Sequence, residues 1–363
     1  MNSSDYKNRI ERLAAQLPSD IDGAIITSQV NRHFLTGYDT DTGWLIVTKN
    51  GSAYTTDFRY IEAASAALDG VCSVAMFGNF SEVMRGLLDS FNADKLLVER
   101  ERLFLADAAQ LAKAIAPHQT VETPQLDEIL NSMRICKNEY ELEMCRAAQR
   151  ITEASLKQLF SCVREGVTER ELALELEFIM RRSGAQRVAF DLIVAGGANS
   201  SMPHAVPGDY RVQKGDFITF DIGSVVAGYH SDMTRTVALG GVTDEMKKVY
   251  DIVLKAQLAG VDYLTSGGTD AYQADKIARD IIAAEGYGEC FGHSLGHGVG
   301  LEIHELPRLA PTSKATLTTG NIVTVEPGIY LEGRFGVRIE DMLYITENSA
   351  INLAEFDKEL IIL

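Results

Sequence analysis

The chain has 363 residues, which suggests two domains, and its 46% hydrophobic and 23% charged residues give an ordinary globular composition. Its formal net charge of −17 argues against nucleic-acid binding, which needs a basic surface. The N-terminus lacks the apolar stretch of a secretory signal, no apolar run approaches the roughly 18 residues of a transmembrane helix, and the five cysteines are scattered without a CxxC pair. We therefore expect a cytoplasmic protein with reduced thiols and no membrane partner.

In the first 115 residues, short apolar runs alternate with segments of helical periodicity. We expect strands at 23–28, 43–48, 52–57, 71–77 and 95–100, and helices at 5–16, 59–68, 81–91 and 106–115. This alternation predicts a small α/β domain with a mixed sheet. Because the region holds few clustered histidines or acidic residues, we expect no chemistry of its own there.

The pattern changes after Pro117 and Pro124, so we place a domain boundary near 125–135 and expect domains at 1–130 and 131–363. In the second domain we expect helices at 138–163, 243–265 and 269–285, and another that begins at the T-x-x-E capping box of Thr168 and Glu171. Expected strands cover 190–197, 216–224, 229–239, 321–331, 335–346 and the terminal 360–363. This order predicts an α+β fold with a curved antiparallel sheet backed by helices.

Five potential metal ligands lie in four unusual runs of the last 150 residues, DIGSVVAGYHSD (221–232), GHSLGHGVGLEIHE (292–305), VEPGIY (325–330) and GVRIED (336–341). The ligands are Asp221, Asp232, His297, Glu326 and Glu340. Four carboxylates and one imidazole suit two divalent cations that share bridging carboxylates. A ligand set without cysteine favours Mn²⁺ or Co²⁺ over a metal selected by thiolates.

Each candidate also has a simpler interpretation when taken alone. Asp221 and Asp232 could be a turn residue and a capping residue, although a β-hairpin or bulge between them could aim both carboxylates at one point. Glu326 ends an apolar strand, where a carboxylate is costly to bury unless it is paired or metal-bound. Glu340 could form an ion pair with Arg338, which could instead orient a ligating carboxylate.

The glycine-rich run around His293 and His297 is unsuited to a helix, because four glycines in nine residues are costly there and the glutamate of an HExxH motif is missing. We expect a strand or loop that brings the backbone close to a ligand, and in a strand the two histidines would face the same side. The glycine spacing is not that of a GxGxxG phosphate loop. Five of the seven histidines lie between 204 and 304, which favours a site over isolated core histidines.

These runs and MPHAVPG (202–208) resemble the pita-bread (M24) proline-specific metallopeptidases, the group of aminopeptidase P, prolidase and methionine aminopeptidase. NRHFLTGY (31–38) and TDFRYIE (56–62) are similar to the creatinase-like N-terminal domain of aminopeptidase P and prolidase, which methionine aminopeptidases generally lack. The resemblance covers nearly the whole chain. It implies a pita-bread catalytic domain after a non-catalytic N-terminal domain.

The resemblance also implies roles for the five ligands in a dinuclear site. Asp221 would chelate one metal, and Asp232 and Glu340 would bridge both. His297 and Glu326 would complete the other. A hydroxide bridging the two ions would be the nucleophile, while Glu326 would act as general base and later protonate the leaving proline nitrogen.

Further residues take roles from the same resemblance. His204 and His304 would contact the substrate and stabilise the oxyanion, and His293 would shape the pocket beside the metals. Tyr330 would line the pocket for proline. Arg308 would bind the C-terminal carboxylate of a dipeptide substrate. A surface arginine paired with Glu302 or Glu305 is the alternative for Arg308.

The expected activity is hydrolysis of Xaa-Pro bonds, with Xaa-Pro aminopeptidase (aminopeptidase P) favoured slightly over Xaa-Pro dipeptidase (prolidase). The segment between Glu302 and Glu326 is as short as in the compact bacterial and archaeal members, which include both activities. A non-enzymatic binding protein on the same fold is a remote alternative. A creatinase-like hydrolase is disfavoured because creatinase lacks the metal ligands. The resemblance also predicts a homodimer.

Overall fold

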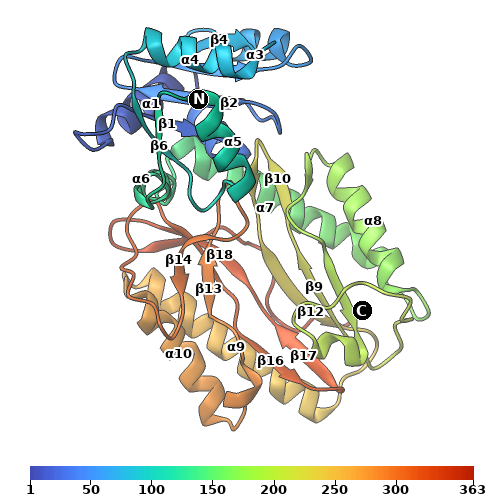
Figure 1. The fold of residues 1–363 in the computed structure, drawn as a ribbon. Coiled ribbons are helices and arrows are strands. Elements are labelled where there is room, and N and C mark those ends of the chain that lie inside the picture. Colours follow the sequence, from blue (N-terminus) through green and yellow to red (C-terminus); the bar gives the residue numbers. More distant parts are fainter. The chain divides into compact units, whose positions relative to one another are not determined.

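The computed structural model describes residues 1–363 and divides the chain into two compact units, Met1–Arg134 and Ile135–Leu363 (Figure 1). Each unit contains its own sheets and helices. None of the helices is long and apolar enough to cross a membrane.

The first unit is built on one six-stranded sheet in the order β4-β3-β2-β1-β5-β6. Its strands are β1 (Gly23–Ile26), β2 (Trp44–Thr48), β3 (Gly51–Thr56), β4 (Ser73–Met76), β5 (Lys95–Val98) and β6 (Gln119–Val121). The β1–β2 and β2–β3 pairs are antiparallel, whereas β1–β5, β3–β4 and β5–β6 are parallel. The mixed sheet predicted from the sequence is confirmed.

Six helices surround this sheet, and two of them were not predicted. They are α1 (Ser3–Gln16), α2 (Gln29–Thr36), α3 (Ile61–Ala67), α4 (Phe80–Ser90), α5 (Leu105–Ile115) and α6 (Gln125–Arg134). The short helix α2 begins at the N-cap Ser28 and ends at Gly37, whose φ of 74° closes it in the left-handed conformation. Its buried face includes the polar Asn31 and Arg32, so it lacks the apolar stripe by which a helix is recognised. Helix α6 lies where we expected only the domain boundary.

The second unit contains four long helices, α7 (Glu139–Leu159), α8 (Glu169–Arg182), α9 (Asp244–Thr265) and α10 (Ala271–Ala284), and three short 3₁₀ helices, η1 (Phe160–Cys162), η2 (Gly197–Ser201) and η3 (Gly288–Cys290). The capping box of Thr168 and Glu171 starts α8 as predicted. Helices α7 and α8 pack on β8 (Ile193–Gly196) and β10 (Ser224–Val226). Helices α9 and α10 pack on the opposite group of strands (Figure 1), which are β14 (Glu305–Leu309), β15 (Ile322–Val325), β17 (Phe335–Arg338) and β19 (Ala350–Asn352). Separate apolar cores fill these two contacts.

All strand pairs of the second unit are antiparallel, as expected. The sheets have the orders β11-β10-β7, β12-β9-β8, β14-β13-β15-β18-β19 and β16-β17. The strands are β7 (Arg187–Val188), β8 (Ile193–Gly196), β9 (Phe217–Ile222), β10 (Ser224–Val226), β11 (Tyr229–His230), β12 (Met233–Ala238), β13 (Gly296–Gly298), β14 (Glu305–Leu309), β15 (Ile322–Val325), β16 (Gly328–Leu331), β17 (Phe335–Arg338), β18 (Asp341–Ile345) and β19 (Ala350–Asn352).

Four strands that we expected to be continuous are each interrupted, and three of the interruptions carry a candidate ligand. Asp232 lies between β11 and β12, Glu326 between β15 and β16, and Glu340 between β17 and β18. At each of these points the chain passes from one sheet to another. The fourth interruption separates β9 from β10 at Gly223. The predicted terminal strand is reduced to an isolated bridge between Ile362 and Ala238.

Candidate metal centre and substrate cavity

A cavity of about 640 Å³ in the second unit contains most of the predicted site residues. Its wall includes Asp221, Asp232, His297, Glu326 and Glu340, together with His204, His293, His304, Arg308 and Arg338. Residues that were more than 100 positions apart in the sequence therefore meet in one place. Tyr330 is not among the residues that line the cavity, and it contacts the site through His293 and Arg338.

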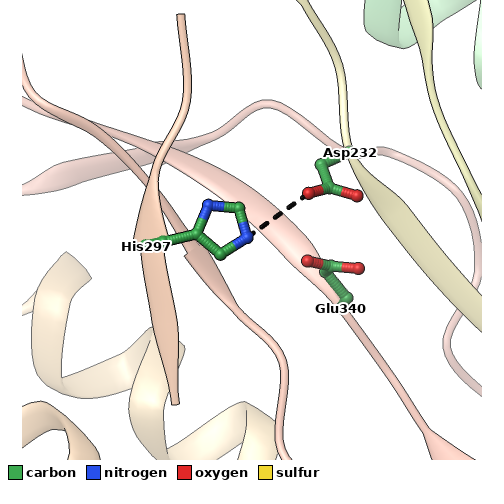
Figure 2. A group of neighbouring side chains, drawn as sticks. All are labelled: Asp232, His297 and Glu340. Atoms are coloured by element: carbon green, nitrogen blue, oxygen red, sulfur yellow. Dashed lines mark ion pairs between the residues drawn. The ribbon is translucent and has the colours of Figure 1, made fainter. Parts of the chain in front are cut away.

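Asp232, His297 and Glu340 form the tightest group. Their potential ligand atoms all lie within 4.8 Å of one another, and their side chains point toward a common centre (Figure 2). His297 Nε2 lies 3.5 Å from Asp232 Oδ2 and 3.4 Å from Glu326 Oε1. Three of the predicted carboxylate ligands, Asp232, Glu326 and Glu340, therefore lie close to the fourth predicted ligand, His297.

The tautomer of His297 suits metal binding. Its Nδ1–H donates to the carbonyl of Gly298 at 3.1 Å, which leaves the Nε2 lone pair facing the carboxylates. Burial lowers the pKa of His297 to about 3, so the ring is neutral. The neighbouring glycines have a steric role, because a Cβ on Gly296 would lie 2.0 Å from Thr324 O and one on Gly298 would lie 2.2 Å from Leu306 O. These two glycines therefore allow the neighbouring strands to approach closely. We had expected them to allow the approach of a ligand.

Asp221 lies on β9 and is the cross-strand partner of Thr234 on β12. Asp232 comes two residues before Thr234, so the alternation of side chains along the chain places both aspartates on one face. The guanidinium of Arg338 contacts Asp221 Oδ2 at 2.5 Å. The other oxygen, Oδ1, is buried and has no hydrogen-bond partner. An unsatisfied buried carboxylate oxygen is costly, and a cation at this position would remove that cost.

The alternative ion pair between Glu340 and Arg338 is not the arrangement found. Arg338 contacts Asp221, while Glu340 Oε2 accepts a hydrogen bond from Thr234 Oγ1 at 2.7 Å. Thr234 Oγ1 in turn accepts from Arg338 Nε at 3.0 Å, so one arginine orients two carboxylates. This contact agrees with the suggestion from the sequence that Arg338 orients a carboxylate that could bind metal.

The carboxylates of the cavity wall repel one another in the absence of a cation. Burial, followed by the neighbouring carboxylates, raises the pKa values of Asp232 and Glu340 well above their usual range. Burial likewise raises the pKa of Glu326 to about 8, against the opposing effect of Arg338. A divalent cation would reverse these shifts by favouring the ionised carboxylates. The donor set therefore fits the predicted metal centre.

A chain of hydrogen bonds holds His293 beside this group. His293 Nδ1–H donates to Ser294 O at 2.9 Å, so the neutral ring accepts at Nε2, 2.9 Å from Tyr330 Oη. Tyr330 accepts in turn from Arg338 at 2.8 Å. Burial lowers the pKa of His293 to about 4, which agrees with a neutral ring.

His304 and Arg308 lie on the β14 side of the cavity. The rings of His304 and His297 meet edge to face with their centroids 4.4 Å apart. Arg308 is the cross-strand partner of His297, so its side chain is on the same face of the β13–β14 pair. Glu305, one suggested surface partner for Arg308, forms a buried ion pair with Lys137 at 2.9 Å.

Sequence reasoning missed two hydroxyl groups that contact the carboxylates. Thr234 donates to Glu340, and Thr324 donates to Glu326 at 3.3 Å. Thr324 stands two residues before Glu326, and Thr234 two residues after Asp232, so the period of two along a strand could have indicated them. The apolar part of the wall was also missed, and no local signal marks it. It includes Phe190, Leu192, Ile193, Val206 and Ile303.

Comparison with known proteins agrees with this site. Residues 143–347 match the model of metallopeptidase family M24, and residues 9–136 match the creatinase/prolidase N-terminal domain. The chain is 35% identical over 356 residues to the Xaa-Pro dipeptidase of Pyrococcus furiosus, which covers 98% of this chain and 100% of the relative.

Two solved structures cover nearly all of both chains. The Xaa-Pro dipeptidase from Bacillus anthracis has a TM-score of 0.92 and 37% identity, with 100% of each chain covered. The X-Pro aminopeptidase from Thermotoga maritima has a TM-score of 0.90 and 33% identity, with 98% of this chain and 100% of that chain covered. The predicted pita-bread architecture is confirmed, and the chain belongs to metallopeptidase family M24, with a creatinase/prolidase N-terminal domain before its peptidase domain.

Proposed function

We propose that this protein is a metal-dependent Xaa-Pro dipeptidase. The sequence alone slightly favoured the aminopeptidase, but relatives of the same length that are named Xaa-Pro dipeptidases favour the dipeptidase. The observation that carries the proposal is the position of Arg308 opposite His297, which brings a guanidinium to the edge of the metal-ligand group. A dipeptide places its free carboxylate only one residue beyond the scissile bond. A cation at this short reach would favour such a substrate.

The metal would be held by Asp221, Asp232, His297, Glu326 and Glu340. The unsatisfied Oδ1 of Asp221 and the outward Nε2 of His297 support this assignment. We propose two ions, with Mn²⁺ preferred and Co²⁺ as the second choice, because all donors are oxygen or imidazole nitrogen. Divalent ions bound there would supply Lewis-acid activation of water and of the scissile carbonyl.

Glu326 is the proposed proton carrier. Its carboxylate would take a proton from the attacking water and deliver it to the proline nitrogen as the peptide bond breaks. Thr324 donates to Glu326 Oε1 at 3.3 Å, which limits the orientations of the carboxylate. With divalent ions bound, the carboxylate would be ionised before the reaction and so able to accept the proton from water.

His204 and His304 are the proposed hydrogen-bond donors to the substrate. Both side chains are exposed to the cavity. The pKa of His304 is lowered by burial first, then by Arg308 and by the nearby His204. Donors placed before the reaction stabilise the negative charge that develops on the carbonyl oxygen. His293, held by Tyr330, would form a fixed part of the wall beside them.

A comparison of Gly-Pro with Gly-Pro-Gly, both with added Mn²⁺, tests this proposal. A dipeptidase will release proline from Gly-Pro and leave the tripeptide nearly intact. Cleavage of Gly-Pro-Gly at an equal or higher kcat/KM would instead assign the aminopeptidase. Pro-Gly serves as a control for proline in the first position. If neither Gly-Pro nor Gly-Pro-Gly is cleaved at any metal loading, the non-enzymatic binding protein becomes the better interpretation.

We also propose that the protein acts as a cytoplasmic homodimer. The most exposed large apolar side chains of the first unit are Phe58, Phe104 and Leu105, which are 82%, 78% and 88% accessible. A partner subunit would remove such surface from water. Light scattering after size-exclusion chromatography measures the mass, and a monomer of 39.8 kDa would contradict the dimer.

A further inference from the structure

One buried carboxylate in the second unit links both ends of the segment that carries His204. Glu169, at the first position of α8, is only 1% accessible. Its Oε1 accepts from Gly196 N at 2.7 Å and from Asn199 Nδ2 at 3.0 Å, and its Oε2 accepts from Gly208 N at 3.0 Å. All three contacts come from the segment 196–208.

His204 lies between these two anchors on a partly exposed stretch, in which its neighbour Ala205 is buried against Ile193 and Ala195. Met202 and Val206, two residues to either side, are 51% and 87% accessible. The other hydrogen bonds from outside the segment lie before His204. Gly336 N donates to Ser200 Oγ at 2.9 Å, Gly333 N to Ser201 Oγ at 3.2 Å, and Arg338 to Pro203 O at 3.4 Å. Between His204 and Gly208 the chain makes no hydrogen bond to another element, so its position there depends on the packing of Ala205 and on the anchor at Gly208.

We propose that Glu169 is a positioning residue for His204. It fixes the separation of the two chain ends at Gly196 and Gly208, and so holds the imidazole at one place in the cavity wall. The N-terminus of α8 adds to this, because Arg170 N donates to Gly208 O at 3.0 Å. The Glu169 side chain, however, joins the outgoing and returning ends to each other by hydrogen bonds. This inference rests on the proposed function, since it assigns His204 a part in the reaction.

The chemistry of the contacts provides a sharp test. All three partners are N–H donors, so the side chain must accept at both of its oxygens. Glu169→Gln keeps the size but replaces one acceptor by an NH₂ group, which would face another N–H. The variant therefore loses one of the two ends whichever way the amide turns.

Glu171→Gln is the matched control. It removes the same charge two residues along the same helix. Glu171 contacts Thr168 N and Thr168 Oγ1, not the His204 segment. Glutamine also serves in a capping box.

The first measurement is steady-state cleavage of Gly-Pro by the metal-loaded enzyme. We expect Glu169→Gln to lower kcat about ten- to a hundredfold, because small misplacements of a catalytic group cost rates of this order. Metal content should stay unchanged, and Glu171→Gln should retain kcat within about twofold of the wild type. The double variant Glu169→Gln/His204→Ala should be no slower than His204→Ala, because the loss acts through His204. The proposal would be overturned if the two substitutions lowered kcat independently, so that their effects multiplied in the double variant. An unchanged kcat in Glu169→Gln would also overturn it.

The second measurement does not depend on activity. Hydrogen exchange in Glu169→Gln should be faster in peptides covering 196–208 and unchanged in those covering 221–232 and 321–340. Unchanged exchange in 196–208 would overturn the positioning role even if the enzyme proved inactive on every Xaa-Pro peptide. If the wild-type protein cleaves no Xaa-Pro peptide but exchange in Glu169→Gln is still faster, the anchoring role is supported. Only the proposed reaction is then contradicted.

Discussion

Arg338 contacts one oxygen of Asp221 at 2.5 Å and leaves the other oxygen buried without a hydrogen-bond partner. The arginine thus neutralises part of the charge and orients the carboxylate, while the other oxygen keeps its lone pairs free in the cavity wall that also holds Asp232, His297 and Glu340. A carboxylate held in this way is prepared for a cation.

Asp232→Asn is expected to abolish metal-dependent activity. Asp232 belongs to the tightest ligand group, and an amide replaces its charged donor with a neutral one. Metal content by mass spectrometry should fall by at least one ion, and kcat/KM on Gly-Pro should drop by three orders of magnitude or more, on the scale of about 4 kcal/mol. Asp191→Asn is the control, because Asp191 lines the same cavity outside the ligand group. Full activity of Asp232→Asn would refute the metal assignment.

Stability of the metal-free protein should fall as the pH rises. The folded-state pKa of Glu326 is raised to about 8, and those of Asp232 and Glu340 are raised as well. Groups with raised pKa values hold protons in the folded state, so their stabilising contribution is present at low pH and is lost as the pH passes the folded pKa. After chelation, we expect the free energy of unfolding to be lower at pH 8.5 than at pH 6 by on the order of a few kcal/mol. The Tm should fall accordingly.

Two controls accompany this experiment. Metal-loaded protein should show a much flatter pH dependence, because the ions favour the ionised carboxylates at both pH values. Glu326→Gln should weaken the dependence in the metal-free form. A metal-free Tm that rises between pH 6 and pH 8.5 would contradict the assigned direction.

Arg308→Ala should distinguish substrates by length. Loss of a charge-assisted contact with the dipeptide carboxylate costs roughly 1.5–3 kcal/mol, or about a ten- to hundredfold rise in KM for Gly-Pro. Any slow turnover of Gly-Pro-Gly should change far less. Arg150→Ala provides a surface arginine for comparison, since Arg150 pairs with Glu143 on the exposed face of α7. Equal losses on both peptides would remove the role of Arg308 as a carboxylate reader and favour the aminopeptidase.

Asp341→Asn should destabilise the peptidase domain strongly. Asp341 is fully buried and accepts from Arg235 at 2.7 Å and from Lys358 at 2.6 Å. Breaking a buried charge cluster from one side typically costs about 3–5 kcal/mol, because the remaining charges stay buried. Asp251→Asn breaks only an exposed pair with Lys247 and should cost about 1 kcal/mol or less. Urea midpoints measured with a chelator present would compare the two without a contribution from metal loss.

Much of the fold and site could be predicted because their signals are local. The capping box of Thr168 and Glu171 starts α8 where expected, since both partners of a cap lie within one helical turn. The five candidate ligands were found because each carboxylate or imidazole stands among strand-forming residues and glycines, and the structure brings all five to one cavity. Their metal coordination remains a prediction.

What the tertiary structure alone decided is how distant segments pair. The expected strand 321–331 breaks at Glu326 because β15 joins one sheet and β16 another, and local periodicity carries no information about which neighbour a strand will have. For the same reason the sequence could not show that Arg338 contacts Asp221 and not Glu340, or that Glu169 joins Gly196 to Gly208. The sequence thus determined which residues could carry the chemistry. Long-range strand pairing and the burial of charge determined where each side chain lies and which partner it contacts.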